Sequence, residues 1–249
     1  MTLYTARDEF SALLLAGSLA HGLAGALSDV DIVLVATEEE YARRQAAGTL
    51  TFSLWDICQY EGGYVDCKVV SPGTLEEIAE RGSDPSRYAF QGAQILRSRI
   101  AGLEPLLTRV TRFPVEQKAS RQTRFVSQIL AWKWYLSQAE AKANSYLMYL
   151  STQKLVLFLC RTLLNANERL YPYHKWLLAE TARVPRKPGD FDGRLQRFLG
   201  EPTFAGAQHL ADLVLGFVGL KEKEVNWPQQ FLVDSELNWV DHEAPVDDL

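Results

Sequence analysis

The chain has 249 residues, of which 47% are hydrophobic, 23% charged and 11% aromatic, and its formal net charge is −5. This ordinary globular composition excludes collagen-like, low-complexity and wholly disordered proteins, and the length is comfortable for two domains. No run approaches the roughly 18 apolar residues of a membrane helix, and the first ten residues do not resemble a signal peptide. The three scattered cysteines (Cys58, Cys67 and Cys160) predict neither a disulfide framework nor a zinc site. We therefore expect a cytoplasmic protein without a membrane partner.

Charge is distributed unevenly along the chain. Residues 1–112 carry 10 Lys and Arg against 15 Asp and Glu, residues 113–223 carry 16 against 9, and residues 224–249 carry none against 7. Nucleic acid is not an expected partner, because duplex affinity rests on many phosphate contacts and the chain is acidic overall. The basic middle region suits a smaller polyanion; the alternative is that its charges only solvate helix surfaces.

Periodicity predicts an α+β fold class. In the first part we expect strands over 12–16, 30–35, 51–60, 64–70 and 93–97, with helices over 19–27, 38–47, 75–81 and 103–112. Beyond Pro114 the spacing predicts helices over 116–142, 145–165, 171–182, 189–199 and 204–223. The expected organisation is a mixed β-sheet flanked by helices in residues 1–112, an all-α helical bundle in residues 113–224 and an acidic tail in residues 225–249.

Two carboxylates begin the second predicted strand. Gly17-Ser18 ends the first strand, ten residues intervene, and Asp29-Val30-Asp31 follows. Because side chains alternate along a strand, Asp29 and Asp31 point to one face, where paired carboxylates attract a divalent cation. Gly17 lets the backbone approach a ligand closely, and a helix opening at Ser18 offers free amides to a phosphate oxygen.

A third carboxylate lies on a later strand. Asp66 and Lys68 share the polar face of a strand whose other face consists of Val65, Cys67 and Val69. An aspartate in such a strand is unfavourable for packing unless it has a partner. Completion of a two-metal site is one such reason, and a buried salt bridge is the alternative.

Together, these motifs resemble the nucleotidyltransferase superfamily that includes polymerase beta and the antibiotic nucleotidyltransferases. The resemblance covers residues 10–70 by motif and 1–112 by element order. It implies in-line attack of an acceptor oxygen on the α-phosphate of a nucleoside triphosphate, with pyrophosphate leaving. The catalytic residues, which would also hold two Mg²⁺ ions, would be Asp29, Asp31 and Asp66. The nucleotide-binding residues would be Gly17, Ser18, Lys68 and, from the helical part, Lys175.

The segment around Lys175 carries its own resemblance. Leu164-Asn165 followed by Leu170–Leu177 (LYPYHKWL) is similar to a segment in helical C-terminal domains of bacterial nucleotidyltransferases. Lys175 is a point charge suited to a triphosphate, whereas the neighbouring aromatic residues either stack on a base or pack the core.

The resemblance predicts transfer of AMP from ATP, or of another nucleoside monophosphate, to a hydroxyl of a small-molecule acceptor. Two alternatives stay open: an acceptor that is a protein hydroxyl or an RNA end, and a non-catalytic nucleotide-binding module. Sequence leaves open the base, the acceptor, the oligomeric state, and whether Asp66, Glu140 or Glu168 is the general base. His21 and Lys154 are weaker candidates for a phosphate contact.

Overall fold

The computed structural model describes residues 8–25, 28–55, 57–58, 60, 62–241 and 243–248. The chain divides into two compact units, Met1–Phe113 (unit 1) and Pro114–Leu249 (unit 2). Unit 1 contains a five-stranded mixed sheet and unit 2 is helical, so the fold class is α+β, as the periodicity predicts.

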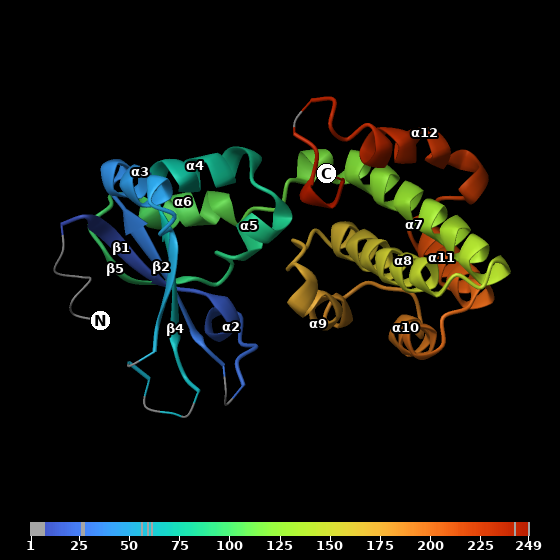
Figure 1. The fold of residues 1–249 in the computed structure, drawn as a ribbon, viewed down its shortest axis with the longest axis horizontal. Helices are drawn as coiled ribbons and strands as arrows, with labels where there is room; N and C mark the ends of the chain where they lie inside the picture. The colour runs from blue at the N-terminus through green and yellow to red at the C-terminus, as the bar shows by residue number, and fades with distance from the viewer. Residues whose placement is uncertain are drawn as a thin grey trace. The chain divides into compact units, whose positions relative to one another are not determined.

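The sheet of unit 1 has the strand order β3-β4-β2-β1-β5, and Figure 1 labels these strands except β3. Neighbours β2 and β4 are parallel, and the other three pairs are antiparallel. The strands are β1 (Phe10–Leu15), β2 (Val30–Ala36), β3 (Thr51–Leu54), β4 (Val65–Val70) and β5 (Gln94–Ser98). The beginnings of β2 and β4 and the end of β3 therefore lie at the same end of the sheet.

Each face of the sheet buries its own apolar cluster. One face, with Leu14 and Val33, packs against the helices α4 (Pro72–Arg81) and α6 (Leu103–Val110). The other face, with Ile32 and Leu34, packs against α3 (Glu38–Ala46) through Tyr41. A β-bulge between Phe10 and Ala12 breaks the alternation of β1, so Phe10 joins the second cluster.

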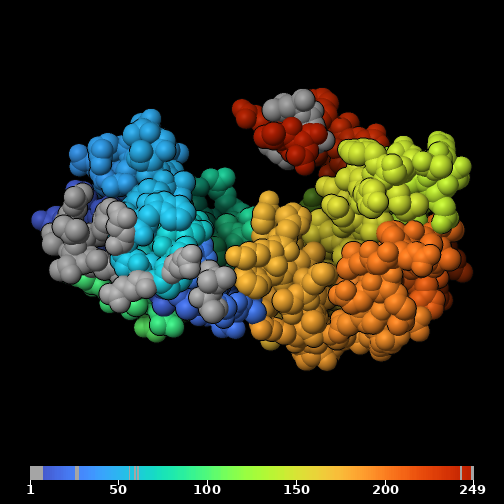
Figure 2. Space-filling view, turned by 60° about the horizontal axis from the view of Figure 1, so that its bottom comes forward, coloured from blue at the N-terminus to red at the C-terminus, as the bar shows by residue number. Residues whose placement is uncertain are grey.

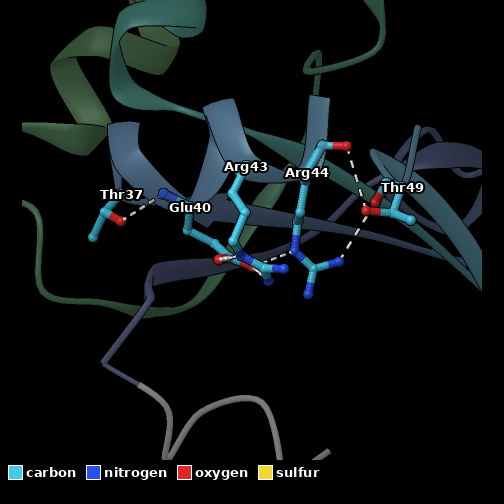
Figure 3. Close-up of polar contacts among 5 residues, drawn as sticks. All are labelled: Thr37, Glu40, Arg43, Arg44 and Thr49. Atoms are coloured by element: carbon cyan, nitrogen blue, oxygen red, sulfur yellow. Dashed lines mark hydrogen bonds and ion pairs between the residues drawn. The ribbon is translucent and has the colours of Figure 1, made fainter. Parts of the chain in front are cut away.

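Helix α3 is held by a carboxylate between two arginines (Figure 3). The Thr37 hydroxyl caps the helix by accepting from the Glu40 backbone N–H at 3.3 Å. Glu40, only 7% exposed, accepts from Nε and Nη2 of Arg43 at 2.7 Å each and from Nε of Arg44 at 2.5 Å. The hydrogen bond from Arg43 is the main cause that lowers the pKa of Glu40. Arg44 also donates to the Thr49 carbonyl, which ties the helix to the loop before β3.

In unit 2, the long helices α7 (Lys118–Ala141) and α8 (Ser145–Ala166) lie side by side (Figure 1). The shorter helices are α9 (Leu177–Ala182), α10 (Phe191–Gly200), α11 (Phe204–Phe217) and α12 (Trp227–Phe231). Figure 2 shows α10 and α11 as an orange surface beside the yellow-green surface of α7. Leu155, Leu159 and Leu163 of α8 are fully buried in the core that these helices share.

Helix α8 is, by length and composition, apolar enough to cross a membrane, with a mean hydropathy of 1.3 over 18 residues. The expectation that no segment is long and apolar enough for a membrane helix is therefore wrong. Half of the window is buried inside unit 2, which is also the pattern of a core helix.

Several predicted elements have other bounds. Residues 26 and 27 of the helix expected over 19–27 lie outside the described residues; before them the helix is the single turn α2 (Gly17–Ala20), because Gly22 at φ +65° lies just beyond it. The strand expected over 51–60 ends at Leu54. The helix expected over 204–223 ends at Phe217, before Gly219 at φ +73°. The sequence interpretation also missed α5 (Asp84–Tyr88), which Ser83 caps.

A further difference lies in unit 2, where the expected acidic tail also makes contacts. The helix expected over 171–182 begins only at a 3₁₀ turn, His174–Trp176, because Tyr173 before it has a φ of +68°. Within the expected acidic tail, α12 packs against α7, and Asp234 accepts from Nε of Arg124 at 2.9 Å. Asp234 of the expected tail therefore has an ion-pair partner on α7.

Candidate functional site

Carboxylates lie in register at the end of the sheet where β2 and β4 begin. The Cα positions of Asp31 on β2 and Asp66 on β4 are paired across the parallel ladder, and Ser53 on β3 is the antiparallel partner of Asp66. Register partners project to the same face, so Asp31 and Asp66 are side-chain neighbours. Asp29, two residues before Asp31, lies on the same face.

An ammonium group lies between these two carboxylates. Nζ of Lys68 is 3.7 Å from Oδ1 of Asp31 and 3.7 Å from Oδ2 of Asp66. The Lys68 side chain is 59% exposed, against 20% for Asp31 and 24% for Asp66. Lys68 thus reduces the repulsion between two half-buried carboxylates, at a place where solvent still has access.

Tyr64, just before β4, holds the third carboxylate. Its hydroxyl donates to Oδ2 of Asp29 at 3.1 Å. This hydrogen bond and the negative charge of Asp29 raise the pKa of Tyr64, so the phenol stays protonated and remains a donor. Sequence reasoning missed Tyr64. The signal that could have found it is its position two residues before Asp66, which places both side chains on one face.

The turn after β1 packs against Asp31. The Ala16 backbone N–H donates to the Asp31 carbonyl at 3.0 Å. Gly17 has a φ of +63°, and a Cβ built there would overlap the Asp31 carboxylate. The next side chain, Ser18, is 4% exposed, and its hydroxyl has no hydrogen-bond partner among the described residues. Gly17 is therefore a direct neighbour of the Asp31 carboxylate, and Ser18 follows it in the chain.

The donor set fits a cation in part. The Lys68 ammonium shows that a positive charge is accommodated near both Asp31 and Asp66, the Gly17 backbone lies against the Asp31 carboxylate where a Cβ would overlap it, and the Ser18 hydroxyl has no hydrogen-bond partner among the described residues. Within the described part of the chain, however, no group of three or more His, Cys, Asp or Glu side chains is arranged to hold a metal ion. The expected three-carboxylate metal set, which includes Asp29, thus stays a prediction.

The weaker phosphate candidates have aromatic neighbours. The His21 ring stacks on the ring of Tyr88 with centroids 4.4 Å apart and an interplanar angle of 18°. In unit 2, Nζ of Lys154 lies 6.0 Å from the ring centroid of Trp132. Both side chains therefore contribute to packing.

The remaining predicted site residues belong to unit 2. Lys175 is exposed in the 3₁₀ turn, with Nζ 5.1 Å from the ring centroid of Trp176. Glu140 accepts from the Phe204 backbone N–H at 3.3 Å at the start of α11, next to the Thr203 cap. Glu168 accepts from Nζ of Lys118 at 2.6 Å, and this hydrogen bond lowers the pKa of Glu168. Both carboxylates thus have structural partners within unit 2.

The aromatic residues before Lys175 differ in their exposure to solvent. Tyr171 is 5% exposed, belongs to the core of unit 2 and shares a hydrogen bond of 3.1 Å with Nδ1 of His174. Tyr173, in contrast, is 58% exposed. Core packing is the observed role of Tyr171.

No protein-family model matches the chain, and no curated protein is significantly similar to it. Among solved structures, the chain is similar to the crystal structure of a nucleotidyltransferase-like protein from Exiguobacterium sibiricum 255-15, with 13% sequence identity and a TM-score of 0.47. The alignment covers 96% of this chain and 76% of that chain. At this identity the likeness does not extend to substrate, metal or acceptor.

Proposed function

We propose that the protein is a Mg²⁺-dependent nucleotidyltransferase that moves a nucleoside monophosphate, AMP from ATP, to a hydroxyl of a small-molecule acceptor. The observation that carries the proposal is the in-register pair Asp31 and Asp66, with an ammonium group between their carboxylates and the Gly17 backbone against Asp31. Packing alone does not favour two neighbouring carboxylates on this face, because desolvating like charges is unfavourable.

Each predicted site residue of unit 1 would have its own role in this reaction. Asp29 and Asp31 would hold one Mg²⁺ ion beside the triphosphate, and Asp31 and Asp66 would hold the second near the acceptor hydroxyl. When bound, the two ions neutralise charge on the α-phosphate and on the leaving pyrophosphate. The amides of the Gly17-Ser18 turn and the Ser18 hydroxyl, which has no hydrogen-bond partner in the described part of the chain, would bind phosphate oxygens.

The remaining steps belong to the strand β4. A carboxylate oxygen of Asp66 would accept the proton of the acceptor hydroxyl. At the same time the hydroxyl oxygen would bond to the α-phosphorus, and the bond from the α-phosphorus to pyrophosphate would break. The Lys68 ammonium would pair with a phosphate oxygen of the substrate. Tyr64 would keep Asp29 oriented through its hydroxyl. Most of the rate enhancement would come from positioning and electrostatics.

One observation favours a second candidate, a nucleotide-binding module without catalysis. Lys68 pairs with both Asp31 and Asp66, and the described residues form no three-ligand metal group. In such a module Lys68 would stay between the carboxylates, and the nucleotide would bind without Mg²⁺.

The decisive experiment compares the wild-type chain with Asp31→Asn. Transfer of label from α-³²P-labelled nucleoside triphosphates to a pool of small hydroxyl compounds, to RNA and to cell proteins is measured with and without Mg²⁺. We expect Mg²⁺-dependent transfer to small molecules, lost in Asp31→Asn with little change in melting temperature. The same variant should lose Mn²⁺ binding measured by electron paramagnetic resonance.

Glu77→Gln is the matched control. Glu77 is an exposed carboxylate of unit 1 that pairs with Arg81, so its loss should leave both transfer and Mn²⁺ binding unchanged. Retained transfer in Asp31→Asn would contradict the two-metal mechanism. Binding of nucleotide without Mg²⁺ and without transfer would favour the non-catalytic module.

A further inference from the structure

An exposed aromatic side chain adjoins the carboxylates on the same face of the sheet. Trp55 follows the end of β3 and is 63% exposed. Its ring stacks on Tyr64 with centroids 4.5 Å apart and an interplanar angle of 27°. Tyr64 in turn donates to Asp29 at 3.1 Å. Trp55, Tyr64 and Asp29 therefore form a continuous row across the ends of three neighbouring strands.

The strand register explains this row. Leu54 is the partner of Val65 across β3 and β4, and Val65 is the partner of Val30 across β4 and β2. Trp55, Tyr64 and Asp29 each lie one residue outside these partners. The next row on the same face, two residues along each strand, contains Ser53, Asp66 and Asp31.

Packing within unit 1 does not account for the exposure of Trp55. One side of its indole lies on Tyr64, and the 63% exposure shows that much of the ring meets solvent. Tyr60, which is 39% exposed, differs in that its hydroxyl donates to the Ser28 carbonyl at 2.6 Å and its ring packs closely on Gly63. Aromatic rings next to a few polar groups are the typical lining of a surface that binds a ligand.

We propose that the exposed ring of Trp55 stacks on a planar ring of a substrate bound at the carboxylates. This inference rests on the proposed nucleotidyltransferase function and names a feature of its substrate: an aromatic or heteroaromatic ring within reach of the reacting hydroxyl or phosphate. The stacked Trp55–Tyr64 pair links that ring to the orientation of Asp29. Tyr64 is thus a positioning residue, and Trp55 determines specificity.

Strand order indicates which substrate carries the ring. The Gly17-Ser18 turn follows β1, on one side of the carboxylates, and Trp55 follows β3, on the other side. A triphosphate bound at the Gly17-Ser18 turn therefore leaves the Trp55 side of the row to the acceptor. The nucleobase is the other source of a planar ring, and the experiment below separates the two.

The experiment uses the full chain and three variants. Trp55→Leu keeps an apolar side chain without a ring, Trp55→Phe restores a ring, and Trp239→Leu removes another exposed tryptophan, in unit 2. Melting temperatures are measured first, and we expect no change for Trp55→Leu because the side chain is mostly exposed.

The first arm tests the nucleobase. Calorimetry measures the binding of Mg²⁺–ATP and of Mg²⁺–tripolyphosphate, which has no base. If the nucleobase stacks on Trp55, Trp55→Leu weakens ATP binding about 3- to 10-fold, the size of one lost aromatic pair, and leaves tripolyphosphate unchanged.

The second arm tests the acceptor. Saturation-transfer NMR compares 4-nitrophenyl β-glucoside with methyl β-glucoside, two hydroxyl compounds that differ in the planar ring. If the acceptor ring stacks on Trp55, the aromatic protons receive saturation in the wild type, lose it in Trp55→Leu and regain it in Trp55→Phe. Methyl β-glucoside and Trp239→Leu should show no such difference.

A response to Trp55→Leu with rescue by Trp55→Phe in either arm supports the ring site and identifies its source. If Trp55→Leu changes binding in neither arm, the ring site is overturned. The proposed function would still stand if Asp31→Asn abolishes Mn²⁺ and ATP binding. A third outcome is that the ring compound binds in a manner that depends on Trp55, but the wild-type protein does not bind ATP with Mg²⁺. That outcome would contradict the proposed function and leave the ring site standing.

Discussion

Gly17 lies directly against the carboxylate of Asp31. Its φ is +63°, and a Cβ at this position would overlap Oδ2 of Asp31. Asp31 is also bound through its backbone, because its carbonyl accepts from the Ala16 N–H. The carboxylate is therefore positioned by the absence of a side chain at residue 17.

Gly17→Ala should displace the Asp31 carboxylate and weaken Mn²⁺ binding at least tenfold, measured by electron paramagnetic resonance. The positive φ adds a strain of about 1–2 kcal/mol. Gly48→Ala separates the two effects, because Gly48 has a φ of +66° but no atom lies within 4 Å of the place that its Cβ would take. Gly48→Ala should lower stability by a similar strain and leave Mn²⁺ binding intact; equal Mn²⁺ affinities in both variants would contradict the role of Gly17.

Lys68→Met should change cation and nucleotide binding in opposite directions. Removing the ammonium between Asp31 and Asp66 eliminates a competitor, so Mn²⁺ alone should bind about 3- to 10-fold more tightly. ATP should bind more weakly, because a charged partner of the triphosphate is lost. Calorimetry with each ligand measures both effects. Arg81→Gln, which removes an exposed cation elsewhere in unit 1, is the control, and unchanged binding of both ligands would mean that Lys68 is only a solvated residue.

Lys175→Ala should weaken triphosphate binding by about 1–3 kcal/mol, the usual effect of losing a hydrogen bond to a charged group. The free nucleoside should bind as before, because the ammonium would contact phosphate alone. Calorimetry with the nucleoside and with the triphosphate decides whether Lys175 binds phosphate or supports the fold. The control is Lys223→Ala, which removes an exposed lysine of the same unit. Equal losses for nucleoside and triphosphate would show that Lys175 only supports the fold.

Glu40→Gln should lower the stability of unit 1 by roughly 1 kcal/mol at pH 7, because the carboxylate accepts charged hydrogen bonds from Arg43 and Arg44. The pKa of Glu40 is lowered in the folded protein, so this contribution is present above the unfolded value of about 4.5 and disappears as pH falls through the folded pKa. Urea unfolding at pH 7 and pH 3 should therefore show a difference from the wild type that narrows in acid. Glu77→Gln, which alters an exposed ion pair, should change the free energy of unfolding little at either pH. If Glu40→Gln lowers the free energy of unfolding equally at pH 7 and pH 3, the contribution of Glu40 does not depend on its ionisation.

Sequence by itself determined the α+β order of elements and the polar face that carries Asp29 and Asp31. Both follow from local rules: side chains alternate with a period of two along a strand, and apolar residues recur with a period near 3.6 along a helix. The same alternation separates Asp66 and Lys68 from the buried Val65, Cys67 and Val69. Local rules were less reliable where glycines intervene, as in the one-turn helix α2.

Only the tertiary structure decided which side chains meet. Parallel pairing of β2 with β4 places Asp31 beside Asp66, although a helix and another strand separate them along the chain, and the register also brings Lys68 to both. Tyr64 and Trp55 carry no motif, and their contacts with Asp29 and with each other follow from pairing across β3, β4 and β2. Periodicity assigns a residue to a face of its own strand, whereas the neighbour on the next strand depends on register, which is set by the packing of both sheet faces.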